Sequence, residues 1–147
     1  MKVGNLARIC TVVAAATLLG AMAACSNGND DDGGAAARLT GSHWELVDVA
    51  GVPAISQVRA TLDFPKPGEL SGNNSCNHFG GKYKTSGTGF EVSGVMQTLI
   101  GCEPAIAAQE MRYMQALGEA ERFAVDGEDL LIYCTGFEEP LRFRPVR

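Results

Sequence analysis

The sequence has few of the residues on which most catalytic and metal sites depend. It contains only two histidines, His43 and His78, and no CxxC or HxxxH pair, which are the usual spacings of zinc ligands. It also lacks a GxSxG motif, the turn that presents a nucleophilic serine in α/β-hydrolases. These absences disfavour a zinc enzyme and a serine hydrolase.

Runs of basic residues are also missing. The 147 residues include 12 Lys and Arg against 17 Asp and Glu, for a net charge of −5 at pH 7. Sequence-independent binding to nucleic acid requires clustered Lys and Arg that neutralise phosphates, so no nucleic-acid partner is expected. The chain shows no internal repeat, and its length suits one folded domain.

The apolar run at residues 9–19 is too short to cross a bilayer as a permanent helix. It follows Lys2 and Arg8 and precedes a series of small residues that ends at Cys25. This arrangement predicts a lipoprotein signal peptide over residues 1–24, with Cys25 lipidated and serving as the mature N-terminus. The alternative is an ordinary signal peptide with Cys25 merely downstream of the cleavage site.

Residues 25–38 are rich in Gly, Asp, Asn and Ala and have no apolar pattern, which predicts a flexible acidic tether. We expect the folded domain to span residues 39–147. The chain would then be held at the membrane through Cys25, in the cell envelope, facing the periplasm or the cell exterior. Loss of Lys2 and Arg8 with the signal leaves 10 of the 12 basic residues against 17 acidic ones.

Alternation of apolar and polar residues predicts a series of short strands in that domain. In the first strand, Trp44, Leu46 and Asp48 fall on one face. A strong hairpin signal, Asp-Gly-Glu-Asp at 126–129, joins two later strands. The expected strands cover residues 42–49, 58–64, 69–73, 78–84, 90–95, 122–125, 130–134 and 140–146, with a tight connection at 65–68.

One segment changes to a helical period. Residues 104–117 begin with Pro, contain helix formers without Gly, and are followed by Gly118 as an expected C-cap. Its apolar stripe carries Tyr113, and we expect this tyrosine and the helix methionines to face the sheet. Glu110 lies within the stripe, which predicts a structural hydrogen bond to a nearby loop. The fold class is therefore α+β, mainly antiparallel β with one packed helix.

Three cysteines remain in the folded part, Cys76, Cys102 and Cys134, which allows three pairings that each leave one thiol. We favour a Cys76–Cys102 disulfide, because both residues lie in irregular, Gly-rich segments that tolerate the required geometry. Such a bond would contribute roughly 3 kcal/mol in the chain-entropy model. Cys134 ends a predicted strand and fits a small buried residue.

The alternative for these residues is a metal-binding or thiol-dependent enzyme that uses Cys76, His78 and Cys102. Cys-x-His is too close for the usual ligand pairs, and an exported chain favours oxidation of its thiols. We therefore expect no catalytic residue, no metal and no cofactor.

The stretch LSGNNSCNHFGGKY at 70–83 is the most particular in the chain. Together with the Trp-x-Leu opening at 44–46, Thr98-x-x-x-Cys102 and Glu110-x-x-Tyr113, it resembles the META domain, the HslJ-like family of bacterial envelope lipoproteins. The resemblance covers residues 39–146. It departs from the family pattern at Asn74-Ser75, where a Gly directly before the cysteine is usual, and at Cys134, where an apolar residue is common.

The resemblance implies a cracked β-barrel with one helix packed on it, and no established enzymatic activity or cofactor. It implies association with heat shock, novobiocin resistance and, in some members, virulence or motility. We therefore expect a non-catalytic envelope lipoprotein in stress response or envelope maintenance, with an envelope protein or a lipophilic ligand as its partner. The residues that carry the family motif, in structural roles, are Trp44, Gly72, Asn77, Phe79, Gly81, Tyr83, Thr98 and Glu110.

Overall fold

The computed structural model describes residues 37–147. The predicted signal peptide, Cys25 and nearly all of the predicted tether lie outside the described residues. The described part opens with a helical turn at residues 37–39 that places Leu39 in the core, fully shielded from solvent. Among residues 37–147, no helix is long and apolar enough to cross a lipid bilayer.

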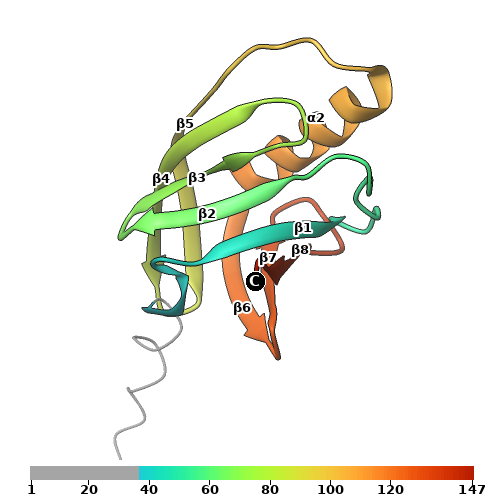
Figure 1. The fold of residues 1–147 in the computed structure, drawn as a ribbon. Coiled ribbons are helices and arrows are strands. Elements are labelled where there is room, and N and C mark those ends of the chain that lie inside the picture. The colour runs from blue at the N-terminus through green and yellow to red at the C-terminus, as the bar shows by residue number, and fades with distance from the viewer. Residues whose placement is uncertain (1–36) are drawn as a thin grey trace, which may run out of the picture.

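Eight antiparallel strands form a closed barrel in which each strand pairs with the next in sequence and β8 pairs with β1. One helix, α2 (Pro104–Gly118), lies between β5 and β6 in the chain (Figure 1). The strands are β1 (His43–Val49), β2 (Thr61–Lys66), β3 (Glu69–Asn73), β4 (His78–Ser86), β5 (Gly89–Gln97), β6 (Ala120–Asp126), β7 (Asp129–Cys134) and β8 (Leu141–Pro145).

The sequence predicted an antiparallel α+β fold, which is confirmed, and a cracked barrel, whereas the strands close into a ring. The strand pairing is shortest between β5 and β6, which pair only through Gly89 and Arg122. Helix α2 connects these two strands in the chain, so they meet at one end only. The ring is therefore closed between β5 and β6 at one end only, and residues 90–97 of β5 have no strand partner on that side among the described residues.

Inward-facing aromatic side chains fill the barrel, as alternation along each strand requires. The ring centroids of Phe64 and Tyr83 lie 5.0 Å apart, edge to face, and Tyr83 stacks on Phe90 at 5.6 Å. Phe123 from β6 lies 5.8 Å from Phe90. We call Phe64, Tyr83, Phe90 and Phe123 the aromatic core.

Helix α2 packs Tyr113, Ala116 and Leu117 against the barrel, all fully buried. The Tyr113 ring lies 5.8 Å from Phe79 and 5.9 Å from Phe143, and its hydroxyl donates a hydrogen bond to the Thr61 carbonyl at 3.1 Å. The prediction that Tyr113 faces the sheet is confirmed. One tyrosine thus joins the helix to three strands.

Two expectations for the helix were wrong. Met111 is 70% exposed, because it lies on the side of the helix away from the barrel, whereas Met114 is partly buried against the core. Gly118 is the last helical residue rather than a left-handed cap, and Glu119 ends the helix through its backbone N–H.

Two strands differ in detail from their sequence patterns. β2 begins later than expected, at Thr61, and continues through Pro65, so the connection to β3 is shorter. In β1 a register shift between Leu46 and Asp48 interrupts the alternation. Val49 is therefore buried in place of Asp48, whose carboxylate instead accepts a hydrogen bond from the Gly51 N–H at 2.6 Å.

Candidate functional site

The most particular stretch of the sequence forms a tight turn between β3 and β4. Asn74 organises it: its N–H donates to the Asn77 carbonyl at 2.9 Å, and its side-chain oxygen accepts from the N–H groups of Cys76 and Asn77 at 3.3 and 2.7 Å. Ser75 adopts φ +95°, a left-handed conformation that favours glycine. The family pattern has a glycine at this place, so Ser75 keeps a glycine-type turn at a cost in backbone strain.

A disulfide joins Cys76 in this turn to Cys102, with Cα atoms 6.0 Å apart. The pairing favoured from sequence is therefore present, and Cys134 remains a buried free thiol, 5% exposed. The bond attaches the β3–β4 turn to the segment that leads into α2. While it is intact, neither Cys76 nor Cys102 has a thiolate to offer as nucleophile or ligand.

Asn77 is 2% exposed and uses its whole amide. Its oxygen accepts hydrogen bonds from the Thr98 hydroxyl at 2.8 Å and the Ile100 N–H at 2.7 Å. Its Nδ2 donates to the Ile100 carbonyl at 3.2 Å and to Glu110 Oε1 at 2.9 Å. Asn77 therefore holds the loop after β5 against the helix.

Glu110 Oε1 also accepts hydrogen bonds from Asn74 Nδ2 at 3.1 Å and from Gln97 Nε2 at 3.3 Å. The predicted structural bond from Glu110 to a nearby loop is confirmed, with three amide donors converging on one oxygen. We call Asn74, Asn77, Gln97 and Glu110 the amide cluster. No hydrogen bond among the described residues uses the second oxygen, Oε2.

Gln109, 8% exposed, extends this polar network away from the helix. Its oxygen accepts a hydrogen bond from the Ile55 N–H, and its nitrogen donates to Ser75 Oγ, both at 2.7 Å. The strained residue in the turn is thereby tied to α2. Every buried side-chain nitrogen or oxygen in residues 37–147 has a partner.

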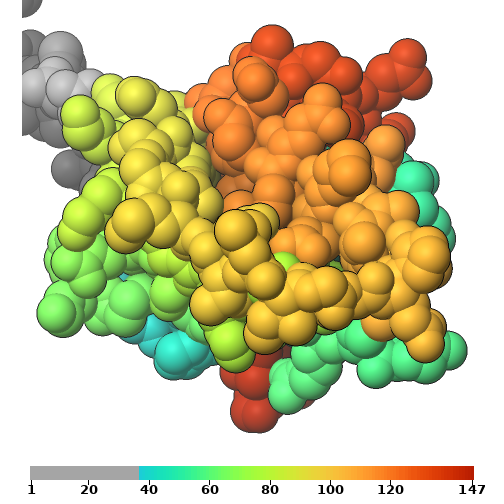
Figure 2. Space-filling model, turned by 90° about the horizontal axis from the view of Figure 1, so that it is seen from above, coloured from blue at the N-terminus to red at the C-terminus, as the bar shows by residue number. Residues whose placement is uncertain are grey.

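A groove of about 480 Å³ lies over the amide cluster, between the loop after β5 and helix α2. In Figure 2 the yellow residues of β5 and its following loop run beside the orange residues of the helix. The groove has a polar floor and apolar walls. Its lining residues are Asn77, Gln97, Leu99, Ile100, Gly101, Ala107, Glu110, Met111 and Met114.

Large apolar side chains are exposed around this groove. Leu99 is 90% exposed, Met111 70% and Ile100 62%. From Ser93 to Ala105 no residue is even partly buried, although the segment contains several apolar side chains. A contiguous exposed apolar surface on a small domain usually marks a binding site.

Two motif glycines position the strands beneath this site. A methyl group on Gly72 would lie 2.2 Å from the Thr61 carbonyl oxygen and 2.9 Å from the Phe79 ring. One on Gly81 would lie 3.1 Å from the Ser93 carbonyl oxygen and from the Val95 side chain. Close approach of neighbouring backbones therefore explains why the motif uses glycine at these two places.

The remaining sequence candidates lie elsewhere. Trp44 is in the core, with its indole N–H donating to Ser42 Oγ at 2.6 Å. His78 begins β4 as an exposed residue, and His43 lies 2.9 Å from Asp63 on the surface. In the described part of the chain, no three His, Cys, Asp or Glu side chains gather as a metal site would need.

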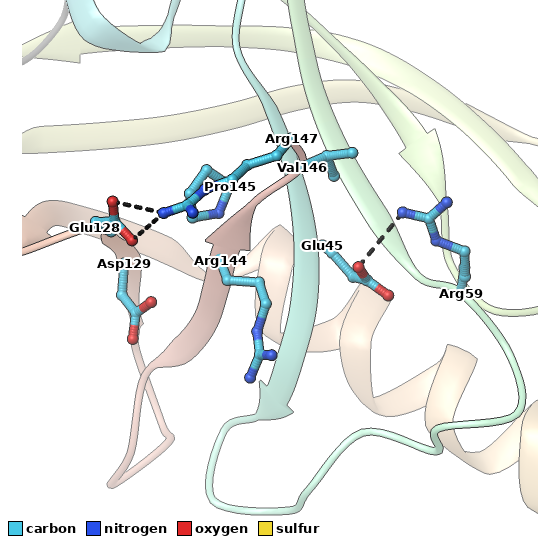
Figure 3. A pocket seen from close by; sticks show the side chains of 8 residues that line it. All are labelled: Glu45, Arg59, Glu128, Asp129, Arg144, Pro145, Val146 and Arg147. Atoms are coloured by element: carbon cyan, nitrogen blue, oxygen red, sulfur yellow. Dashed lines mark hydrogen bonds and ion pairs between the residues drawn. The ribbon is translucent and has the colours of Figure 1, made fainter.

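A second hollow, of about 490 Å³, lies near the C-terminus and is lined mainly by charged residues (Figure 3). Arg147 pairs with Glu128 at 2.8 Å and Arg59 with Glu45 at 3.4 Å, with Arg144 between the pairs. These pairs are solvent-exposed, so each contributes little to stability or specificity. The groove beside α2 is the better candidate.

The sequence did not reveal several residues of the site. Asn74, Gln97 and Gln109 are central to its hydrogen bonds, yet isolated amides carry no periodic signal. The one available hint was the polar composition of residues 73–77, between strands that are otherwise apolar. The groove itself arises because residues 98–103 stand away from the barrel, which no local pattern encodes.

The fold and the site define a small antiparallel barrel with one packed helix, whose β3–β4 turn is linked by a disulfide to the loop before that helix. The model of the META domain matches residues 37–145, and the chain belongs to the META domain family.

Solved structures with the same fold include an NMR structure of a protein 20% identical to this chain, with a TM-score of 0.61, covering 74% of this chain and 92% of its own. An NMR structure of a protein from Burkholderia xenovorans is 17% identical, with a TM-score of 0.61 and coverage of 76% and 86%. A crystal structure of a DUF4847 family protein from Bacteroides vulgatus ATCC 8482 is 14% identical, with a TM-score of 0.54 and coverage of 72% and 93%. At these identities the likeness establishes the fold alone. No similar protein was found among curated sequences.

Proposed function

We propose that this chain is a non-catalytic, lipid-anchored protein of the cell envelope, acting in stress response or envelope maintenance. Its META domain binds an envelope protein or a lipophilic ligand in the groove beside α2. The observation that carries this proposal is the exposure of Leu99, Ile100 and Met111 around one groove.

Exposed apolar area has a cost that supports a binding role. Each square ångström of apolar surface left in water forgoes roughly 25 cal/mol of stabilisation, so a domain with a filled core gains nothing from keeping this surface exposed. The barrel interior is filled by its aromatic core and leaves the surface groove as the place for a ligand. Because the groove floor is polar, a ligand with an apolar body and a hydrogen-bonding group fits it best.

The anchor rests on the sequence of residues 1–25. A lipid at Cys25 would hold the domain at a membrane through the acidic tether, where envelope proteins and lipids are at high local concentration. Metabolic labelling with palmitate should mark the unmodified protein and not the Cys25→Ala variant, and the intact mass of the mature protein should include a lipid at Cys25. A mature protein without that lipid would contradict the anchor.

The disulfide also favours binding over the thiol-dependent alternative. A nucleophile or metal ligand at Cys76 or Cys102 needs a free thiolate, and the bond between them removes both.

The binding proposal is tested with full-length protein carrying Leu99→Lys and Met111→Lys. Its control carries Val52→Lys and Val146→Lys, which replace apolar side chains that are 48% and 39% exposed and do not line the groove. Two readouts are needed: affinity for a fluorescent lipid analogue with an uncharged head group, and site-specific photocrosslinking from residue 100 in a bacterial envelope. The groove variant should lose at least one of these signals, while the control keeps both. If neither signal exists, or both variants lose it equally, the proposal is wrong.

A further inference from the structure

Strand β5 has an open edge. On one side it pairs with β4 along its length, from the Ser86–Gly89 pair to the Phe79–Gln97 pair. On its other side, β6 pairs with it only at Gly89. Residues 90–97 therefore have no strand partner on that side in the described part of the chain, and residues 93–97 are exposed. Such an edge is a template for one more strand.

The edge carries few of the features by which proteins protect open strands. Residues 90–97 read FEVSGVMQ and contain no Lys and no Pro, and their one charged residue, Glu91, lies opposite Lys84. The exception is a bulge at Gly94, φ +60°, where the register with β4 shifts. Beyond it, Val95 is 37% exposed and Met96 79%, so the strand presents apolar side chains as well as free backbone.

Hollows lie at both ends of this edge. One, of about 470 Å³, is lined by residues 84–86 of β4, residues 89–91 of β5, and Ala120 and Glu121 of β6. The other is the groove beside α2, which begins at Gln97 and continues to Met111. An extended segment laid along β5 would start in the first hollow and end in the groove.

The charge of the groove indicates which type of side chain that segment should carry. Glu110 is the one charged residue that lines the groove, and its Oε2 accepts no hydrogen bond from the described residues. A carboxylate with spare acceptor capacity, surrounded by apolar walls, favours a Lys or Arg side chain. Residues 89–101 contain neither, so a second copy of this chain paired through β5 could not supply that cation from the same segment.

We propose that the β5 edge binds an extended segment of a partner protein as an added strand, with alternating apolar side chains and one Lys or Arg that reaches Glu110. This deepens the proposed function and depends on it. Main-chain hydrogen bonds to residues 90–97 supply affinity, and Met111 and Glu110 supply selectivity.

The test uses the mature lipidated chain in nanodiscs and fluorescein-labelled synthetic peptides. The probe is an eight-residue peptide that alternates valine with threonine and lysine. One control peptide is N-methylated along one edge, and another has glutamate in place of lysine. We expect each control peptide to bind at least about tenfold more weakly, a difference of about 1.4 kcal/mol or more in binding free energy. Hydrogen exchange should slow in residues 90–97 on addition of the probe.

Three variants complete the test. Glu110→Gln should lose the preference for lysine over glutamate, and Met111→Lys, at a surface position, should weaken binding of the lysine probe about tenfold. Val52→Lys should bind as the unmodified protein does. Equal binding of the N-methylated peptide, or equal binding of the glutamate peptide, would overturn the proposal, as would concentration-dependent self-association that protects β5.

The measurements distinguish failure of the added-strand proposal from failure of the proposed function. If no peptide binds, but the uncharged lipid analogue binds and Met111→Lys abolishes that binding, the groove takes a lipophilic ligand and only the strand proposal is wrong. If neither probe binds and residue 100 gives no envelope crosslink, both proposals are wrong.

Discussion

The aromatic core and the amide cluster both hold segments of the chain together, but the first does so by apolar packing and the second by hydrogen bonds. In the core, Phe64, Tyr83, Phe90 and Phe123 exclude water and hold four strands by shape. In the amide cluster, the buried groups are polar and nearby apolar side chains such as Leu99 are exposed. Shape packing tolerates no gap, whereas the cluster depends on every hydrogen bond having its partner.

This difference indicates which of the two regions is available for binding. A domain of this size needs one apolar core, and the aromatic core supplies it. The amide cluster fixes a loop that would otherwise be free, and thereby holds apolar side chains in water. Substitutions in the two regions should therefore differ in how much stability they cost.

Gly72 lies two residues before Asn74 of the amide cluster, and Gly72→Ala should have the largest effect. A methyl group there meets the Thr61 carbonyl at 2.2 Å, so the strands must separate, and we expect a loss of about 3 kcal/mol or more in unfolding free energy. Chemical denaturation measures it. Gly80→Ala is the matched control, because its methyl would lie 3.8 Å from the nearest carbonyl oxygen. Similar losses in both variants would show that backbone approach is not the cause.

Removal of the disulfide should come next. The bond closes a sequence separation of 26, for which the chain-entropy model gives about 3 kcal/mol. The Cys76→Ser, Cys102→Ser double variant should lose that amount while the near-UV circular dichroism of the aromatic core remains. Loss of the aromatic signal as well would mean that the two regions are not separable.

Asn77→Ala should cost about 2–3 kcal/mol, because Glu110, Thr98 and the Ile100 backbone all lose a partner. Hydrogen exchange should rise first in residues 98–103. Asn73→Ala is the control, since its side chain accepts one bond, from the Ser75 N–H, and should cost less than about 1 kcal/mol. Equal costs would contradict the central place of Asn77.

Two substitutions at Ser75 distinguish the cost of backbone strain from the loss of a hydrogen bond. Ser75→Gly and Ser75→Ala both lose the bond from Gln109, but only glycine relieves the positive φ. The glycine variant should therefore be more stable than the alanine variant by about 1 kcal/mol, as measured by thermal or chemical unfolding. No difference between them would mean that the turn relaxes without strain.

The smallest effect concerns Cys134, a thiol in the apolar region. Burial raises its pKa to about 12, so it should not react with iodoacetamide at pH 8 unless the protein unfolds. The unfolded chain ionises this thiol near pH 9 and the folded chain does not, so stability should fall as pH rises from 9 to 12. Cys134→Ala should show a shallower decline. Rapid alkylation of the folded protein would contradict this burial.

Much of the fold was readable from sequence because burial on one side of a strand leaves a period-two pattern. The hairpin at Asp126 and the placement of Tyr113 followed from such local rules, and both are confirmed. Barrel closure was less accessible, because the pairing of β1 with β8 joins the two ends of the domain and has no local signature. Met111 was misplaced for a related reason: an apolar residue on a helix predicts an apolar contact, but the sequence does not identify the group that it contacts.

The site was predictable in part. Glu110 stood out as a charge in an apolar stripe, and the cysteine pairing followed from the character of the segments around Cys76 and Cys102. The partners of Glu110 were hidden, because Asn74, Asn77 and Gln97 come from three places in the chain. Only the packing of the helix across the β3–β4 turn brings them to one oxygen.

The disulfide has one more consequence, for proteolysis. The loop it closes contains the whole β4–β5 hairpin, including the exposed turn at residues 86–89. A protease that cuts in that turn therefore releases nothing: the two fragments remain one covalent molecule and stay paired to their neighbouring strands. The cut would appear only on a reducing gel, and the nicked protein would keep its groove.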